Sequence, residues 1–136
     1  MLITIKPKPL SEVKAEKIAQ IEAAYIAAMQ QPVTYMGTTF QADAASQDIL
    51  TKTLVTLNAT GSVPPGFWWR DANNANVAMT LAELNELAGA MLNQGWAAFQ
   101  QRVERKDVVT AATSTAEVDA ATSTAEVDAV APAQVV

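Results

Sequence analysis

Apolar residues recur at helical spacing in three stretches of the chain, which predicts three α-helices. The first covers residues 11–31 with Ser11 as its N-cap, the second covers residues 46–57, and the third runs from residue 80 to about residue 104. The positions expected to face the core are Val13, Ile18, Ile21, Tyr25, Ala28 and Met29, then Ile49, Leu50, Thr53, Leu54 and Leu57, then Leu81, Leu84, Leu87, Ala88, Met91, Leu92 and Phe99.

The strongest local signal is the tetrapeptide TLAE at residues 80–83. The Thr80 hydroxyl can accept a hydrogen bond from the Glu83 amide, while the Glu83 carboxylate can accept one from the Thr80 amide. This reciprocal pair is a capping box, and it predicts where the third helix begins.

The hydrophobic period changes in two places between the helices, and each change predicts a short β-hairpin. The first has strands at residues 33–35 and 39–41, with Met36 and Gly37 in the turn. The second has strands at residues 67–70 and 76–79 around the turn-prone sequence DANN.

Trp68 and Trp69 are adjacent in one of these predicted strands. Successive side chains of a strand point to opposite faces, so one tryptophan should face the core. The other should face the rim of the domain or a neighbouring protein chain. The two rings therefore cannot form one flat platform for a sugar.

Residues 1–9 form a predicted extended N-terminal arm. Leu2, Ile3 and Ile5 favour a strand, and Pro7 and Pro9 then keep the chain extended and prevent a helix. Such an arm can add to the sheet edge of a neighbouring chain. An ordinary first strand or a frayed end is the alternative.

Residues 107–136 form an acidic segment of low complexity. The nonapeptide AATSTAEVD occupies residues 111–119 and recurs identically at residues 120–128. Nine residues make two and a half helical turns or an odd number of strand positions, so Val118 and Val127 would face opposite ways in either structure. The repeat therefore predicts a mobile C-terminal tail.

Charge and composition restrict the chemistry that the chain can perform. Of its 14 acidic residues five lie beyond residue 106, and all 9 basic residues precede that point, so the net charge of −5 belongs to the tail. No Lys/Arg cluster is dense enough to indicate nucleic acid as a partner. The chain has no Cys and no His, which excludes thiolate zinc sites and removes the commonest general base. We therefore expect that the protein is not an enzyme and that it has no catalytic, cofactor-binding or metal-binding residues.

Two further features bear on partners and location. Charged residues make up 17% of the chain, below the roughly 25% typical of soluble domains, which favours a protein that sits among partners. No apolar run reaches the roughly 18 residues that span a membrane, and the first residues do not resemble a signal peptide. We expect synthesis in a cytoplasm and no membrane insertion.

The stretches VTYMGTTFQADAASQDIL and GFWWRDANNANVAMTLAELNELAGAM, with their spacing, resemble a domain of unknown function found in tail and tail-fibre proteins of tailed bacteriophages and prophages. The resemblance covers roughly residues 10–105. The matching positions are Tyr35, Gly37, Phe40, Ala42, Asp43, Trp69, Asp71, Asn73, Asn74, Thr80, Leu81, Leu84 and Leu87. It implies a phage-encoded virion or assembly protein and supplies no catalytic residue.

These observations lead to one prediction of architecture. We expect a small α+β fold of three helices and two hairpins at residues 10–106, between the arm at residues 1–9 and the tail at residues 107–136. The expected contacts with other chains are made by Leu2, Ile3, Ile5, Tyr35, Trp68 and Trp69.

The leading functional hypothesis is a non-enzymatic structural component of a phage tail, at the tail tip, baseplate or fibre attachment. It would be oligomeric or part of a symmetric assembly with other tail or fibre proteins, made in the bacterial host cytoplasm and located in the virion. The alternatives are a tail-fibre assembly chaperone absent from the mature virion, and a host-surface carbohydrate-binding module.

Overall fold

The computed structural model describes residues 7–121 of the chain. Within them the fold is α+β, as predicted, with two antiparallel hairpins and with four helices where three were expected. Three of the predicted contact residues, Leu2, Ile3 and Ile5, lie outside the described residues. In chain order the elements are α1 (Leu10–Ala28), β1 (Val33–Tyr35), β2 (Thr38–Phe40), α2 (Ala44–Thr60), β3 (Trp68–Arg70), β4 (Asn76–Ala78), α3 (Leu81–Ala111) and α4 (Thr115–Ala121).

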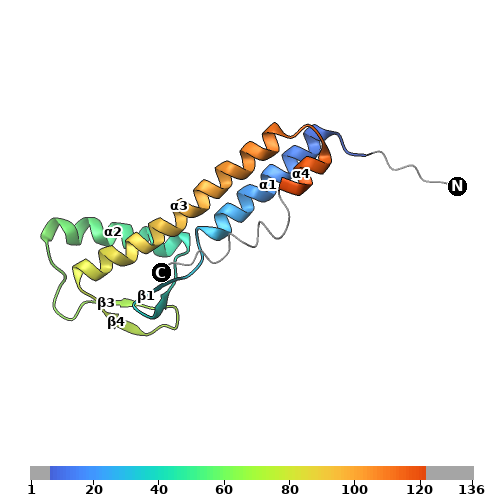
Figure 1. Ribbon diagram of the computed structural model, residues 1–136. Coiled ribbons are helices and arrows are strands. Elements are labelled where there is room, and N and C mark those ends of the chain that lie inside the picture. Colours follow the sequence, from blue (N-terminus) through green and yellow to red (C-terminus); the bar gives the residue numbers. More distant parts are fainter. Residues whose placement is uncertain (1–6, 122–136) are drawn as a thin grey trace.

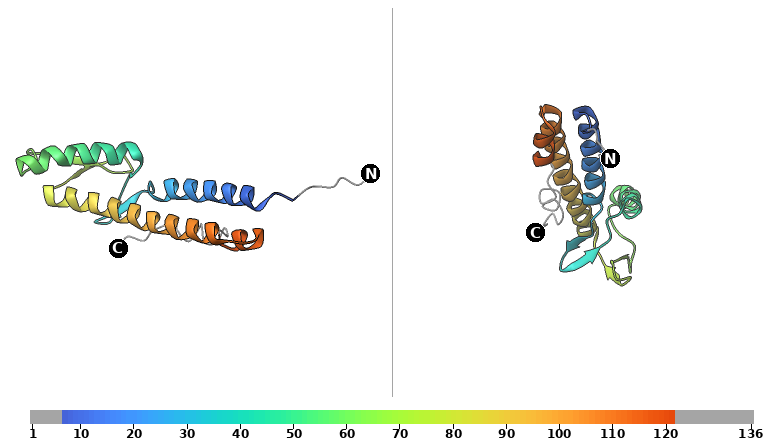
Figure 2. Two further views of the ribbon diagram at one scale, coloured as in Figure 1. Left: turned by 90° about the horizontal axis from the view of Figure 1, so that it is seen from above. Right: turned by 90° about the vertical axis from the view of Figure 1, so that its right-hand side faces the viewer.

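The long helix α3 is the element around which the others are arranged (Figure 1). Helix α2 lies along its N-terminal half and α1 along its C-terminal half, so these two helices follow one another on the same side of α3 (Figure 2, left). Both hairpins lie at the end of the molecule where α3 begins, and α4 packs against α1 and α3 at the opposite end. The molecule is therefore elongated, and much of α3 is covered on one side only.

The main hydrophobic core lies at the hairpin end. The first hairpin pairs Val33 with Phe40, and the second pairs Trp69 with Val77. A backbone hydrogen bond of 2.8 Å from the Ala72 amide to the Thr39 carbonyl joins the two hairpins. The buried residues of this core are Val33, Phe40, Ala42, Leu50, Leu54, Leu57, Met79, Leu84, Leu87 and Met91.

The helix starts show where local sequence determines structure. The predicted capping box is present: the Glu83 amide donates to Thr80 Oγ1 at 3.1 Å, and the Thr80 amide donates to Glu83 Oε1 at 2.9 Å. Helix α2 begins two residues earlier than predicted, because the Asp43 carboxylate accepts from the Ser46 amide at 2.8 Å and caps it. Hydrogen bonds from the Ser46 side chain and amide lower the pKa of Asp43.

The first helix differs from its prediction at both ends. It begins at Leu10 with Pro9 as its N-cap, so Ser11 does not cap it. The Pro9 carbonyl accepts hydrogen bonds from the Glu12 and Val13 amides, at 3.0 and 3.1 Å, and the proline ring fixes the extended backbone that an N-cap needs. The helix ends at Ala28, earlier than the predicted residue 31.

The C-terminal part of the described chain is packed, where a mobile tail was expected. Helix α3 continues past residue 104 to Ala111, so the predicted boundary at residue 106 falls inside it. After a short turn α4 follows, and Val118 is fully buried against Ile21, Val109 and Ala112. This second core exists because α1, far away in sequence, supplies an apolar surface for α4.

The start of α4 has a signal in the sequence. The tetrapeptide STAE at residues 114–117 has the form of a capping box. The Glu117 amide donates to Ser114 Oγ at 3.2 Å, and the Glu117 carboxylate accepts from the Thr113 amide at 2.6 Å. Hydrogen bonds from Thr113 lower the pKa of Glu117. The first copy of the repeat is thus partly a helix-start sequence.

Candidate functional site

A row of large apolar side chains on α3 is exposed to solvent. The exposed fractions are 71% for Leu92, 56% for Trp96, 37% for Phe99 and 38% for Val103. These residues follow one another at steps of four, three and four positions, which places them on one face of the helix. We call these four residues the α3 stripe.

Two members of the α3 stripe, Leu92 and Phe99, are predicted from helical spacing to face the core, and that prediction is wrong. The core face of this part of α3 is formed by neighbours such as Met91 and Ala98. Because α1 and α2 lie on the same side of α3, Leu92 and Trp96 remain more than half exposed, whereas Phe99 keeps a contact with Tyr25 of α1. Ile49 on α2, also assigned to the core from its spacing, is likewise exposed.

Aromatic stacking holds the central part of the α3 stripe in place. The rings of Trp96 and Phe99 are stacked, with centroids 5.7 Å apart and an interplanar angle of 17°. Tyr25 of α1 meets Phe99 edge to face at 6.4 Å. The Arg102 guanidinium lies 5.2 Å from the centroid of Tyr25 and 5.9 Å from that of Phe99. Such pairs favour a defined ring geometry, so the exposed rings form an ordered surface.

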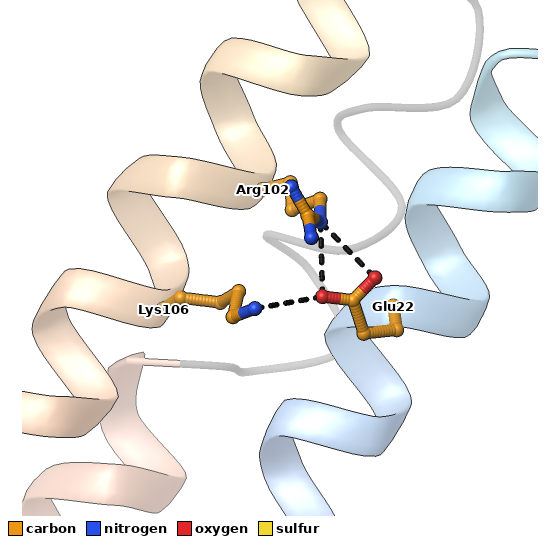
Figure 3. A network of polar contacts seen from close by, with 3 residues as sticks. All are labelled: Glu22, Arg102 and Lys106. Atoms are coloured by element: carbon orange, nitrogen blue, oxygen red, sulfur yellow. Dashed lines mark hydrogen bonds and ion pairs between the residues drawn. The ribbon is translucent and has the colours of Figure 1, made fainter.

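Arg102 is itself fixed by an ion-pair network between α1 and α3 (Figure 3). Its Nε donates to both carboxylate oxygens of Glu22, at 2.9 and 3.0 Å. Lys106 Nζ donates to Glu22 Oε1 at 2.8 Å. The hydrogen bonds from Lys106 and Arg102 lower the pKa of Glu22. The network thus joins α1 to α3 and positions the cation that lies over Phe99.

The two adjacent tryptophans lie as the strand alternation predicts. Trp69 packs against the main core, while Trp68 is 47% exposed. The Arg70 guanidinium lies 5.5 Å from the centroid of the Trp68 ring, and Asn76 Oδ1 accepts from Arg70 Nε and from a terminal guanidinium nitrogen. One side of the exposed indole is therefore occupied by a cation from the same strand.

Tyr35 makes its polar contact within the molecule. Its ring packs against the main core, and its hydroxyl donates to Glu86 Oε2 on α3. This hydrogen bond to Glu86 raises the pKa of Tyr35 to about 12. The contact ties the first hairpin to α3, so one structural role of Tyr35 is intramolecular.

A shallow hollow of about 230 Å³ lies between the second hairpin and the start of α2. Several of its polar groups already serve the fold. Asp71 Oδ1 accepts from the amides of Asn73 and Ala75, at 2.8 and 2.9 Å, and so builds the hairpin turn. Arg70 is bound to Asn76, and Ser46 belongs to the cap of α2. The residues lining the hollow are Gln41, Ser46, Ile49, Trp69, Arg70, Asp71 and Asn74.

Residues 7–121 contain no group of three or more Asp or Glu side chains placed to hold a metal ion. No helix within that range is both long enough and apolar enough to cross a bilayer.

The structure brings the predicted contact residues Tyr35, Trp68 and Trp69 to the hairpin end, and it adds a surface that the sequence did not predict. The α3 stripe has a signal nonetheless, because the segment LNQGWAAFQQ at residues 92–101 carries no charge. An uncharged segment in a long helix with two large aromatic residues can mean either burial or an interface. The positions of α1 and α2 relative to α3 show which side chains of this segment are buried and which are exposed.

Comparison with known proteins gives one family. Residues 12–123, well over half of the chain, match the family model described as Domain of unknown function (DUF4376). No curated protein and no solved structure matches the chain. The match begins at the third residue of α1 and runs past α4, so it includes nearly all of α1, the other three helices and both hairpins. The chain therefore belongs to the DUF4376 family.

Proposed function

We propose that this protein is a non-enzymatic structural component of a bacteriophage tail, at the tail tip, baseplate or fibre attachment, and that it acts by docking to other protein chains. The observation that carries the docking role is the exposed α3 stripe, with Leu92 and Trp96 more than half exposed. The assignment to a phage tail rests on the resemblance of residues 10–105 to a domain of phage tail proteins.

The α3 stripe has the properties expected of a docking surface. Contiguous exposed apolar side chains on a soluble domain usually mark an interaction site, and tryptophan and phenylalanine are enriched at protein interfaces. Phe99 is held by Tyr25 and Arg102, and Trp96 stacks on Phe99. Ordered side chains lose less conformational entropy when a partner binds. Docking is the role that these features support best.

The test is the composition of purified phage particles that encode this chain. Quantitative mass spectrometry should find its peptides at a fixed copy number relative to the major tail protein. The Trp96→Glu variant should be folded but depleted from particles, because a buried unpaired carboxylate opposes docking. Val55→Glu is the matched control, since Val55 is 69% exposed on α2 and lies outside the α3 stripe.

Two results would contradict the proposal. Absence of the chain from particles, together with binding to an unassembled fibre protein in infected cells, would indicate an assembly chaperone. Binding to a glycan array that is lost in Trp68→Ala and kept in Trp96→Glu would indicate a carbohydrate-binding module.

A further inference from the structure

The spacing of the α3 stripe matches a short piece of a coiled-coil seam, less than two heptads long, between Gly89 and Lys106. Steps of four, three and four residues from Leu92 to Val103 are those of alternating d and a positions in a heptad, the pattern by which two similar helices pack together. A helix with this pattern on an open face can pair with the same face of an identical helix. The contact would then be isologous, as in the commonest homo-oligomers.

Charge around the α3 stripe permits such self-association. The segment at residues 92–101, which holds three of the four members of the α3 stripe, has no charged side chain, so two copies can meet there without like-charge repulsion. Val103, the fourth member, lies between Arg102 and Glu104. The nearest cation, Arg102, is bound to Glu22 on its own chain. Arg102 therefore needs no partner from the second copy when two such surfaces meet.

The exposed area is close to what a dimer requires. The exposed fractions of the four side chains correspond to roughly 400 Å² per copy. Two copies would bury about 800 Å² from these side chains, and the exposed uncharged neighbours Asn93 and Gln100 bring the total toward about 1,000 Å², the lower limit for a specific interface. A dissociation constant on the order of 1–100 µM fits an interface of that size.

The charges disfavour a lipid surface as the occupant. Helices that lie on membranes combine an apolar face with many Lys and Arg side chains that contact anionic headgroups. The basic residues beside the α3 stripe, Arg102 and Lys106, both bind Glu22. The net charge of the whole chain is −5, which opposes binding to an anionic bilayer.

We infer that the α3 stripe binds a second copy of this chain, so that the protein forms a symmetric dimer through the middle of α3. This inference rests on the proposed docking function and names the partner of that surface. It is independent of whether the protein resides in a phage tail.

The dimer is tested by sedimentation equilibrium of the full chain over concentrations from about 1 to 300 µM, a range set by the expected dissociation constant. Wild type and Val55→Glu should show the same monomer–dimer equilibrium. Leu92→Glu and Trp96→Glu should each raise the dissociation constant by roughly 30-fold or more, as hot-spot residues do. Far-UV circular dichroism of each variant should match wild type, since both side chains are exposed in the monomer.

Cysteine cross-linking locates the contact. The chain has no cysteine, so any disulfide formed after one substitution must join two chains. Asn93 and Gln100 are exposed on one side of the α3 stripe, and an interchain disulfide through Asn93→Cys or Gln100→Cys, which requires Cα atoms about 4.4–6.8 Å apart, would place the contact there. Val55→Cys, on α2, should stay reduced.

Several results of these experiments would contradict the dimer. A wild-type monomer throughout the range, a dimer that persists in Trp96→Glu, or cross-linking only through position 55 would overturn the inference. Co-sedimentation of the monomer with phosphatidylcholine vesicles, lost in Trp96→Glu, would overturn it in favour of a lipid surface. A monomer that is nevertheless present in particles contradicts the dimer alone, whereas a dimer absent from particles contradicts the phage-tail assignment alone.

Discussion

Replacing Val118 by alanine tests whether α4 is an integral part of the fold. The Val118 side chain is fully buried with Ile21, Val109 and Ala112, at the end of the molecule opposite the hairpins. The substitution removes two methyl groups at about 0.8 kcal/mol each and leaves a small cavity. The free energy of unfolding should therefore fall by about 1.5–3 kcal/mol.

The measurement is urea unfolding followed by circular dichroism. Val108→Ala is the matched control, because Val108 lies near the same end of the molecule and is 51% exposed. We expect a change of about 0.5 kcal/mol or less for this control. Equal effects of the two substitutions would refute the packing of α4 against α1 and α3, and would restore the mobile tail predicted from the repeat.

Three further predictions concern the N-cap of α3 and the titrating groups Tyr35 and Glu22. Thr80→Ala removes the hydroxyl half of the capping box and should lower the free energy of unfolding by about 1 kcal/mol, measured in urea. In a Tyr25→Phe background, ultraviolet absorbance should show Tyr35 ionising near pH 12, and Glu86→Gln should lower that value. Because the folded-state pKa of Tyr35 is raised, its stabilisation is present below about pH 10 and is lost as the pH rises toward 12. For Glu22 the folded-state pKa is lowered, so its stabilisation is present above about pH 4.5 and is lost as the pH falls further. Glu22→Gln should flatten that acid limb of melting temperature against pH, and an unchanged limb would argue against the network.

Sequence predicted the elements that depend on local interactions. The α3 start follows from Thr80 and Glu83 alone, and both hairpins follow from short apolar runs around turn residues such as Asn74, whose backbone is left-handed with φ of 62°. The opposite orientations of Trp68 and Trp69 follow from the period of a strand.

Features that depend on distant partners were not predicted. The burial of Val109 and Val118 requires Ile21 of α1, which local periodicity cannot supply. The same reasoning applies to Leu92 and Phe99, whose spacing suits either a core or an interface. Because α1 and α2 occupy one side of α3, this apolar face remains exposed, and the candidate site became visible only in three dimensions.

Hydroxyl-radical labelling of the tryptophans tests most directly whether the protein works through the α3 stripe. Trp96 and Trp68 are exposed to similar extents, at 56% and 47%, so their reaction rates in dilute protein can be compared directly. In dilute purified protein the two should react at similar rates. In intact phage particles labelling of Trp96 should fall several-fold relative to dilute protein, because a docked chain excludes solvent. Equal labelling of Trp96 in particles and in dilute protein would contradict the account.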